Sequence, residues 1–167
     1  MTELTLRKIA DLLAADDPGF ESKDDARTSY YNRGRMLRDR GLIRSSVGAQ
    51  QGRTTTFAEA DAVAAAVMIC ANRDGTSWGI LNHIHERLRP FENTTGLRAF
   101  EDHLEEIKAG ASITIRVYVI RKPFPSVDVK MGRPSDLPSG HELGATKTED
   151  ISVDAVSKPI IKAFGTE

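Results

Sequence analysis

Apolar side chains recur at helical spacing in the first 70 or so residues, and they predict three helices. The first spans Leu4 to Ala15, with Thr5 as its cap. The second is expected from Ala26 to Arg40, where Asp24 or Asp25 can cap the start and Gly41 can end it. The third, rich in alanine, runs from Ala58 to Asn72.

Two short strands are expected between the second and third helices, at residues 42–44 and 54–57. The stretch between them, residues 45–52, is rich in Gly, Ser and Gln and is typical of a hairpin tip. Helix, helix, β-hairpin and helix is the order of a winged helix-turn-helix, in which the second helix enters the major groove of DNA.

The rest of the chain predicts a small helix-helix-hairpin region, so the expected fold class is α+β. Ser77 can open a helix that ends at Pro90, and Thr94 or Thr95 can open another that ends at Gly110. Alternation over residues 111–121 predicts a half-buried strand with Thr114, Arg116 and Tyr118 on its outer face, and residues 127–131 predict its hairpin partner. Helical spacing returns over residues 151–164, interrupted by Pro159.

These elements suggest four segments. Residues 1–73 form the winged helix-turn-helix, and 74–131 form an α/β region for dimerisation or effector binding. Residues 132–148, with many Gly, Pro and Ser, are expected to be a flexible loop. Residues 149–167 are expected to be an apolar segment that docks on its own domain or on a partner subunit.

Charge changes this picture, because it is unevenly distributed. The 167 residues carry a formal net charge of -1. The window from Arg27 to Arg53, however, contains seven Arg and a single acid, Asp39, a net of +6. The guanidinium group suits phosphate oxygens and guanine edges better than a point charge does. A solvated helix face is the plainer explanation of such a run.

At 100° per residue, several of these side chains share one sector of the second predicted helix, while Ala26, Tyr30 and Leu37 share another. The wing adds arginines at the base of the hairpin, placed for contacts to the DNA backbone. The candidate DNA-binding residues are Arg27, Thr28, Tyr31, Arg35, Arg38, Arg44 and Arg53.

Three segments carry a resemblance to a known family: Tyr30-Tyr31, Gly41-Leu42-Ile43, and residues 53–61, Arg-Thr-Thr-Thr-Phe-Ala-Glu-Ala-Asp. Together they resemble the N-terminal DNA-binding domain of MerR-like regulators, over residues 4–70. The resemblance implies a winged helix-turn-helix with a paired-tyrosine recognition helix. The stretch from Tyr31 to Gly41 is about one helical turn longer than in that family, and Phe57 follows Arg53 by four residues rather than two. A winged helix of another lineage, such as a phage excisionase-like module, fits nearly as well.

Other chemistry finds no support in the sequence. There is no phosphate-binding glycine loop, no Ser/His/Asp set and no metal-ligand spacing, so we expect neither an enzyme nor a cofactor or metal. The lone Cys70 indicates a reducing compartment, and neither a signal peptide nor a membrane span is expected, which favours the cytoplasm.

The sequence therefore predicts a bacterial or phage transcription regulator that binds double-stranded DNA sequence-specifically as a homodimer. Whether a small-molecule effector binds is left open. A winged-helix adaptor that binds protein and not DNA is the main alternative. An enzyme with an appended binding domain is another, and it would need a polar pocket in the C-terminal part.

Overall fold

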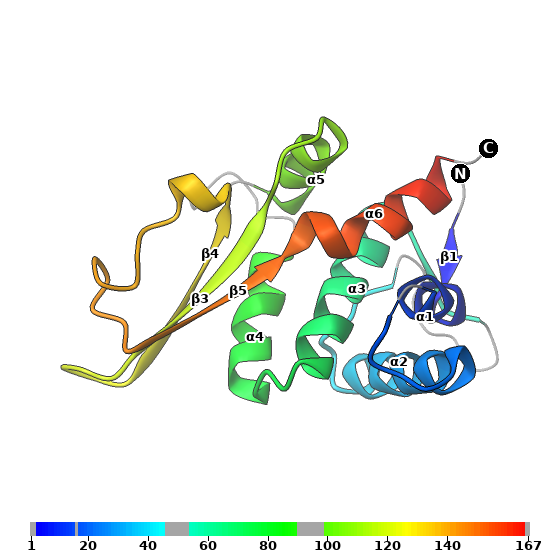
Figure 1. Ribbon diagram of the computed structural model, residues 1–167, viewed down its shortest axis with the longest axis horizontal. Coiled ribbons are helices and arrows are strands. Elements are labelled where there is room, and N and C mark those ends of the chain that lie inside the picture. Colours follow the sequence, from blue (N-terminus) through cyan, green and yellow to red (C-terminus); the bar gives the residue numbers. More distant parts are fainter. Residues whose placement is uncertain (1–2, 16, 46–53, 90–98, 166–167) are drawn as a thin grey trace. The chain divides into compact units, whose positions relative to one another are not determined.

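The structure, a computed structural model, describes residues 3–15, 17–45, 54–89 and 99–165. The chain divides into two compact units, residues 1–76 with 156–167, and residues 77–155. Each unit contains both helices and antiparallel strands, so the expected α+β class is confirmed (Figure 1).

In the first unit three helices pack against one another, and a short two-stranded sheet contacts two of them. Its strands pair antiparallel, with Leu4 opposite Phe57 and Thr5 opposite Thr56. Thr5 also caps the first helix as predicted, because its hydroxyl accepts a hydrogen bond from the Lys8 N–H at 3.2 Å. The elements are β1 (Leu4–Thr5), α1 (Leu6–Ala14), α2 (Lys23–Asp39), β2 (Thr56–Phe57) and α3 (Glu59–Arg73).

The second helix, α2, begins earlier than predicted. Its cap is Ser22 rather than Asp24 or Asp25: the Ser22 hydroxyl accepts from the Asp25 N–H at 3.1 Å and donates to the Asp25 carboxylate at 2.7 Å. The helix ends as predicted at Gly41, whose φ of 73° is the left-handed conformation that glycine adopts readily. The Leu42 N–H then bonds back to the Leu37 carbonyl at 2.9 Å, which completes a Schellman motif.

The prediction of a strand at residues 42–44 is wrong. Leu42 and Ile43 lie in irregular backbone and are buried, at 5% and 7% exposure, so their apolar character reflects core packing rather than strand pairing. The partner of β2 is β1, close to the N-terminus. The predicted hairpin tip at residues 45–52 lies almost entirely outside the described residues.

Close packing fixes α2 against its neighbours. A Cβ added at Gly34 would lie 2.6 Å from Cδ1 of Leu6 and 3.2 Å from Cδ1 of Ile69, which belong to α1 and α3. The backbone of α2 therefore approaches both helices at a point where only glycine fits without displacing a core side chain.

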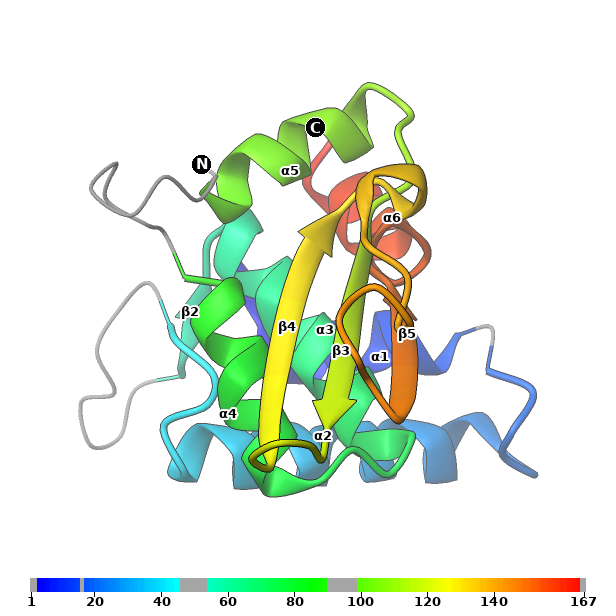
Figure 2. The ribbon, with the colours of Figure 1, turned by 90° about the vertical axis from the view of Figure 1, so that its left-hand side faces the viewer.

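The second unit is built on a three-stranded antiparallel sheet with β3 in the centre and β4 and β5 at its edges (Figure 2). The helix α4 packs against β4, where Arg87 Nε donates to the Val129 carbonyl at 2.6 Å. Residues 90–98, including Pro90, Thr94 and Thr95, lie outside the described part of the chain. The elements are α4 (Trp78–Arg87), α5 (Phe100–Lys108), β3 (Thr114–Ile120), β4 (Ser126–Gly132) and β5 (Lys147–Ser152).

The sequence did not predict β5. Residues 132–148 were expected to form a loop, but they contain a 3₁₀ turn at Pro134–Asp136 and the start of the third strand. The segment also crosses the outer face of β3, since the Tyr118 hydroxyl donates to the Pro138 carbonyl at 2.6 Å. Tyr118 is consequently fully buried, and the half-buried strand predicted from alternation is covered there on both faces.

A bidentate ion pair ties β5 to β3. Arg116 donates from Nε and Nη2 to the two carboxylate oxygens of Asp150, at 2.7 and 2.8 Å. The chain then enters α6 (Val153–Phe164), which contains Pro159, and residues 156–167 group with the first unit. The apolar C-terminal segment thus packs within this chain.

Candidate nucleic-acid interface

The two sides of α2 differ sharply. One side is buried in the first unit and consists of Ala26, Tyr30, Gly34 and Leu37. The sector predicted to bind DNA lies away from these residues: Thr28 and Arg35 are exposed, and Tyr31 and Arg38 are half-buried. The structure therefore brings the predicted α2 residues together on one side of the helix.

Some of the positive charge on this side is already compensated. Arg27 forms ion pairs with Asp11 of α1 at 2.5 Å and with Asp24 at 3.3 Å. Arg38 pairs with the adjacent Asp39 at 3.2 Å. By contrast, neither Arg35 nor Arg44, both exposed, forms an ion pair with another described residue.

Not every arginine of the basic window belongs to this sector. Arg33 donates from Nη1 to the Asn72 side chain at 2.9 Å and to the Asn72 carbonyl at 3.3 Å, which joins α2 to α3. Arg53 lies outside the described residues, so its assignment to the wing stays a prediction.

A hollow of about 410 Å³ opens where α2 meets the start of α1 and the approach to β2. The Arg7 guanidinium lies over the ring of Tyr31, 5.7 Å from its centroid. Two cationic groups therefore border one polar hollow, as a phosphate group would require. The lining residues are Thr5, Leu6, Arg7, Tyr31, Arg38, Thr54 and Thr55.

Sequence reasoning found only Tyr31 and Arg38 of this hollow. Arg7 was missed because it lies outside the basic window, near the start of the chain. The spacing along the sequence carries no signal for its contact with Tyr31, because that contact depends on how α1 crosses α2.

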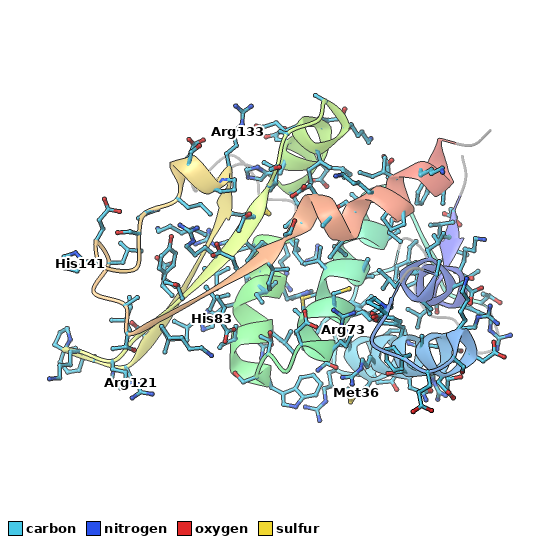
Figure 3. The ribbon with its side chains drawn as sticks, in the orientation of Figure 1. Met36, Arg73, His83, Arg121, Arg133 and His141 are labelled. Atoms are coloured by element: carbon cyan, nitrogen blue, oxygen red, sulfur yellow. The ribbon has the colours of Figure 1, made fainter. Side chains whose placement is uncertain are left out.

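A partly buried polar network holds α2 in place from its inner side. The Tyr30 hydroxyl donates to the Asp17 carboxylate, and Arg73 Nη1 donates to the same oxygen at 2.7 Å and to the Tyr30 oxygen. The Gly19 N–H adds a bond to Asp17 at 2.8 Å. Arg73 lies where the end of α3 meets α2 (Figure 3). The network thus connects the loop before α2 to both helices.

The network shifts the proton affinities of its members. The Tyr30 hydroxyl holds the pKa of Asp17 below its ordinary value of 3.8, assisted by the Gly19 N–H and by Arg73 and opposed by burial. Burial, together with the hydrogen bond to Asp17, raises the pKa of Tyr30. Asp17 is therefore ionised and Tyr30 neutral at neutral pH.

Cys70, in α3, is 8% exposed, and burial raises the pKa of its thiol to about 11. Relative to the ordinary value of 9.0, this lowers the thiolate fraction at neutral pH by about a hundredfold, and the thiolate is the reactive form. We expect Cys70 to react with a disulfide reagent at least about a hundredfold more slowly in the native protein than in denaturant. Comparable rates in the two states would show that α3 is not packed as described.

The described residues contain no cluster of three or more His, Cys, Asp or Glu side chains able to hold a metal ion. Across the same part of the chain, every helix is too short or too polar to cross a lipid bilayer. No model of a known protein family matches this chain, and a comparison with curated proteins finds no match either.

Proposed function

We propose that the first unit binds double-stranded DNA as a winged helix-turn-helix of the MerR-like type, with α2 in the major groove. The observation that carries this proposal is the side of α2 opposite the core, where Arg35 is exposed without an ion pair to any described residue and Thr28 is exposed about two turns earlier. Arg and Thr side chains at the surface of such a helix are suited to hydrogen bonds with base edges.

The order of the helices supports the same proposal, although the described residues contain no strand at 42–44 to form the predicted hairpin with β2. α1 and α2 are followed by β2 and α3, and β2 pairs with the strand that precedes α1. The approach to β2 lies on the side of the unit that carries the hollow, because Thr54 and Thr55 line it. Arg44, which is exposed beyond the end of α2, would then contact the DNA backbone, whereas a contact by Arg53 stays a prediction because that residue lies outside the described part of the chain.

The hollow gives the phosphate contacts a specific location. Arg7 and Arg38 border it, and Thr54 adds an exposed hydroxyl. A phosphate seated between the two guanidinium groups would fix the depth of α2 in the groove without reading sequence, as phosphate contacts do in general. Arg35 would then supply the sequence-dependent contact.

We further propose that the protein is a transcription regulator that acts as a dimer. Many helix-turn-helix proteins bind paired half-sites through two-fold symmetry. The sheet of the second unit, with edge strands β4 and β5, offers a surface on which two copies could pair. Sedimentation of the full chain measures the oligomeric state directly.

The deciding experiment is a titration of the full chain against labelled random-sequence duplex at two salt concentrations. We expect affinity to fall with salt, with a log–log slope of about 0.9 per phosphate contact. Arg7→Gln and Arg38→Gln should each lower that slope by about 0.9, whereas Lys158→Gln, an exposed charge on α6, should leave it unchanged. Binding that does not depend on salt, or is absent, would favour the protein-binding adaptor.

Arg35→Ala tests whether Arg35 helps the protein to recognise a particular DNA sequence. After selection of a preferred duplex from a random pool, we expect the variant to bind it more weakly by about 1–3 kcal/mol. Its affinity for random duplex should change much less, so its preference for the selected site should relax. Equal losses on both duplexes would mean that Arg35 contacts phosphate rather than a base edge.

A further inference from the structure

The turn between β3 and β4 presents an aromatic side chain to solvent. Phe124 is 78% exposed, the highest value among the large apolar residues of the described chain, where only Met36 at 37% also counts as exposed. It lies between Pro123 and Pro125, both exposed. A phenylalanine displayed in this way contributes nothing to the core of the second unit.

Two cations precede this aromatic residue. Arg121 and Lys122 are exposed, and neither forms an ion pair with another described residue. Other basic side chains of the same sheet are compensated: Lys130 pairs with Asp128 at 3.2 Å, and Arg116 pairs with Asp150. The free positive charge of the hairpin is therefore concentrated at its turn, where Arg121 marks the end of the hairpin (Figure 3).

The strands on both sides of the turn are fully paired. Pairing between β3 and β4 continues without a break from Thr114 opposite Gly132 to Ile120 opposite Ser126. The neighbouring strand β5 pairs with β3 as far as Val119. Because the sheet orders the backbone up to the turn, a ligand that binds there need not immobilise the hairpin first.

We propose that this turn, residues 121–125, is a second DNA contact, in which Phe124 enters the minor groove as an apolar wedge while Arg121 and Lys122 bind the flanking phosphates. The proposal rests on the DNA binding proposed for the first unit. Apolar wedges of Phe or Pro that part adjacent base pairs, flanked by basic side chains, are a known means of bending a duplex. Only the turn need enter the narrow minor groove, since the strands behind it can stay outside.

Charge and apolar area favour DNA over a lipid surface. A single aromatic side chain with two cations gives weak anchoring to a membrane, where stable attachment requires more apolar area or a larger basic cluster. On DNA the same turn is linked through the chain to the first unit, which is proposed to hold the duplex, so its contribution would add to an existing complex.

The test uses the full chain and a random-sequence duplex of about 30 base pairs with a donor and an acceptor dye at its ends. Phe124→Ala should weaken binding about tenfold, the loss typical of one stacked aromatic, and should remove most of the bend seen by energy transfer. Phe124→Leu, which keeps an apolar wedge, should retain most of the bend. Replacing Arg121 and Lys122 together by Gln should lower the salt slope by about 1.8.

The outcomes distinguish failure of the proposed wedge at residues 121–125 from failure of the DNA binding proposed for the first unit. If the wild-type chain binds duplex and Phe124→Ala matches it in both affinity and bend, the wedge is refuted while the first interface stands. If the wild-type chain does not bind duplex at low salt, both proposals fail. If Phe124→Ala loses affinity for phosphatidylserine vesicles and not for duplex, the turn is a membrane contact and the wedge is refuted. Unchanged thermal unfolding of the variants confirms that they are folded.

Discussion

Replacing Asp17 by alanine is expected to lower the free energy of unfolding by about 3 kcal/mol. The Asp17 side chain is only 8% exposed and accepts hydrogen bonds from Tyr30, Arg73 and the Gly19 backbone. Its loss leaves the Tyr30 hydroxyl without its acceptor and Arg73 without its buried partner, and removing one member of a buried ionic cluster typically costs 3–5 kcal/mol. We expect the lower end because Arg73 is one-third exposed and keeps Asp74 at 2.8 Å.

Chemical denaturation followed by far-UV circular dichroism measures this loss. The single tryptophan, Trp78, belongs to the second unit and is a poorer reporter of a change in the first. Asp39→Ala is the matched control, since that carboxylate is 62% exposed and, among the described residues, forms an ion pair with Arg38 alone. Its effect should stay below about 0.5 kcal/mol. Equal losses in the two variants would show that the network does not hold α2.

The same network predicts a pH dependence. Because the pKa of Asp17 is lower in the folded protein than its ordinary value of 3.8, the unfolded chain binds the proton more readily. The stabilisation by Asp17 is therefore complete above that ordinary value and is lost as the pH falls through the folded pKa. Between pH 5 and pH 2, approximately, the wild-type protein should lose more stability than Asp17→Ala. Parallel pH profiles would contradict the assignment.

Phe57→Ala is expected to have the largest effect, a loss of about 4 kcal/mol. Phe57 is fully buried in β2 and stands opposite Leu4 of β1, which is 6% exposed. Truncation removes the ring from a packed core and leaves a cavity that the surrounding side chains fill only in part. The loss would be a large part of the 5–15 kcal/mol typical of a folded domain.

The chain offers a chemically identical control. Phe124→Ala removes the same ring from a position that is 78% exposed, so the free energy of unfolding should change by less than about 0.5 kcal/mol. Similar losses at the two positions would mean either that Phe57 is not packed as described or that Phe124 is covered in solution.

Local patterns predicted much of the fold. The apolar spacing of α1 and α3 and the alternation of β3 and β4 identified these elements to within a few residues. The stop of α2 at Gly41 was predicted for the right reason, since left-handed backbone favours glycine. The start of α2 was not, because Ser, Asp and neighbouring polar residues are all good caps and only the geometry selects among them.

Long-range pairing was the main source of error. β1 and β2 are two residues each and lie more than 50 positions apart, so neither carries a periodic signal. β5 was missed because its sequence, Lys-Thr-Glu-Asp-Ile-Ser, is polar at an edge of the sheet, where charged side chains are ordinary. Tyr118 was expected on an open face and is covered by residues 137–138.

The sequence likewise predicted only part of the candidate interface. The sequence predicted that Tyr31, Arg35 and Arg38 share one side of a helix, since that depends only on helical spacing. It did not predict that Arg7 lies over the Tyr31 ring, or that Arg27 is paired with Asp11. Both contacts depend on the crossing of α1 and α2.

The sequence by itself determined the α+β class, the basic side of α2 and the concentration of positive charge at residues 27–53, because helix periodicity and composition are local properties. Only the tertiary structure decided which arginines are available. Arg33 is bound to α3 and Arg27 to α1, while Arg35 is left exposed and Arg7 joins Arg38 at one hollow. Formal charge can be counted from the sequence. Whether a given arginine can bind a partner depends on whether the fold places a carboxylate or carbonyl within hydrogen-bonding distance of its guanidinium group.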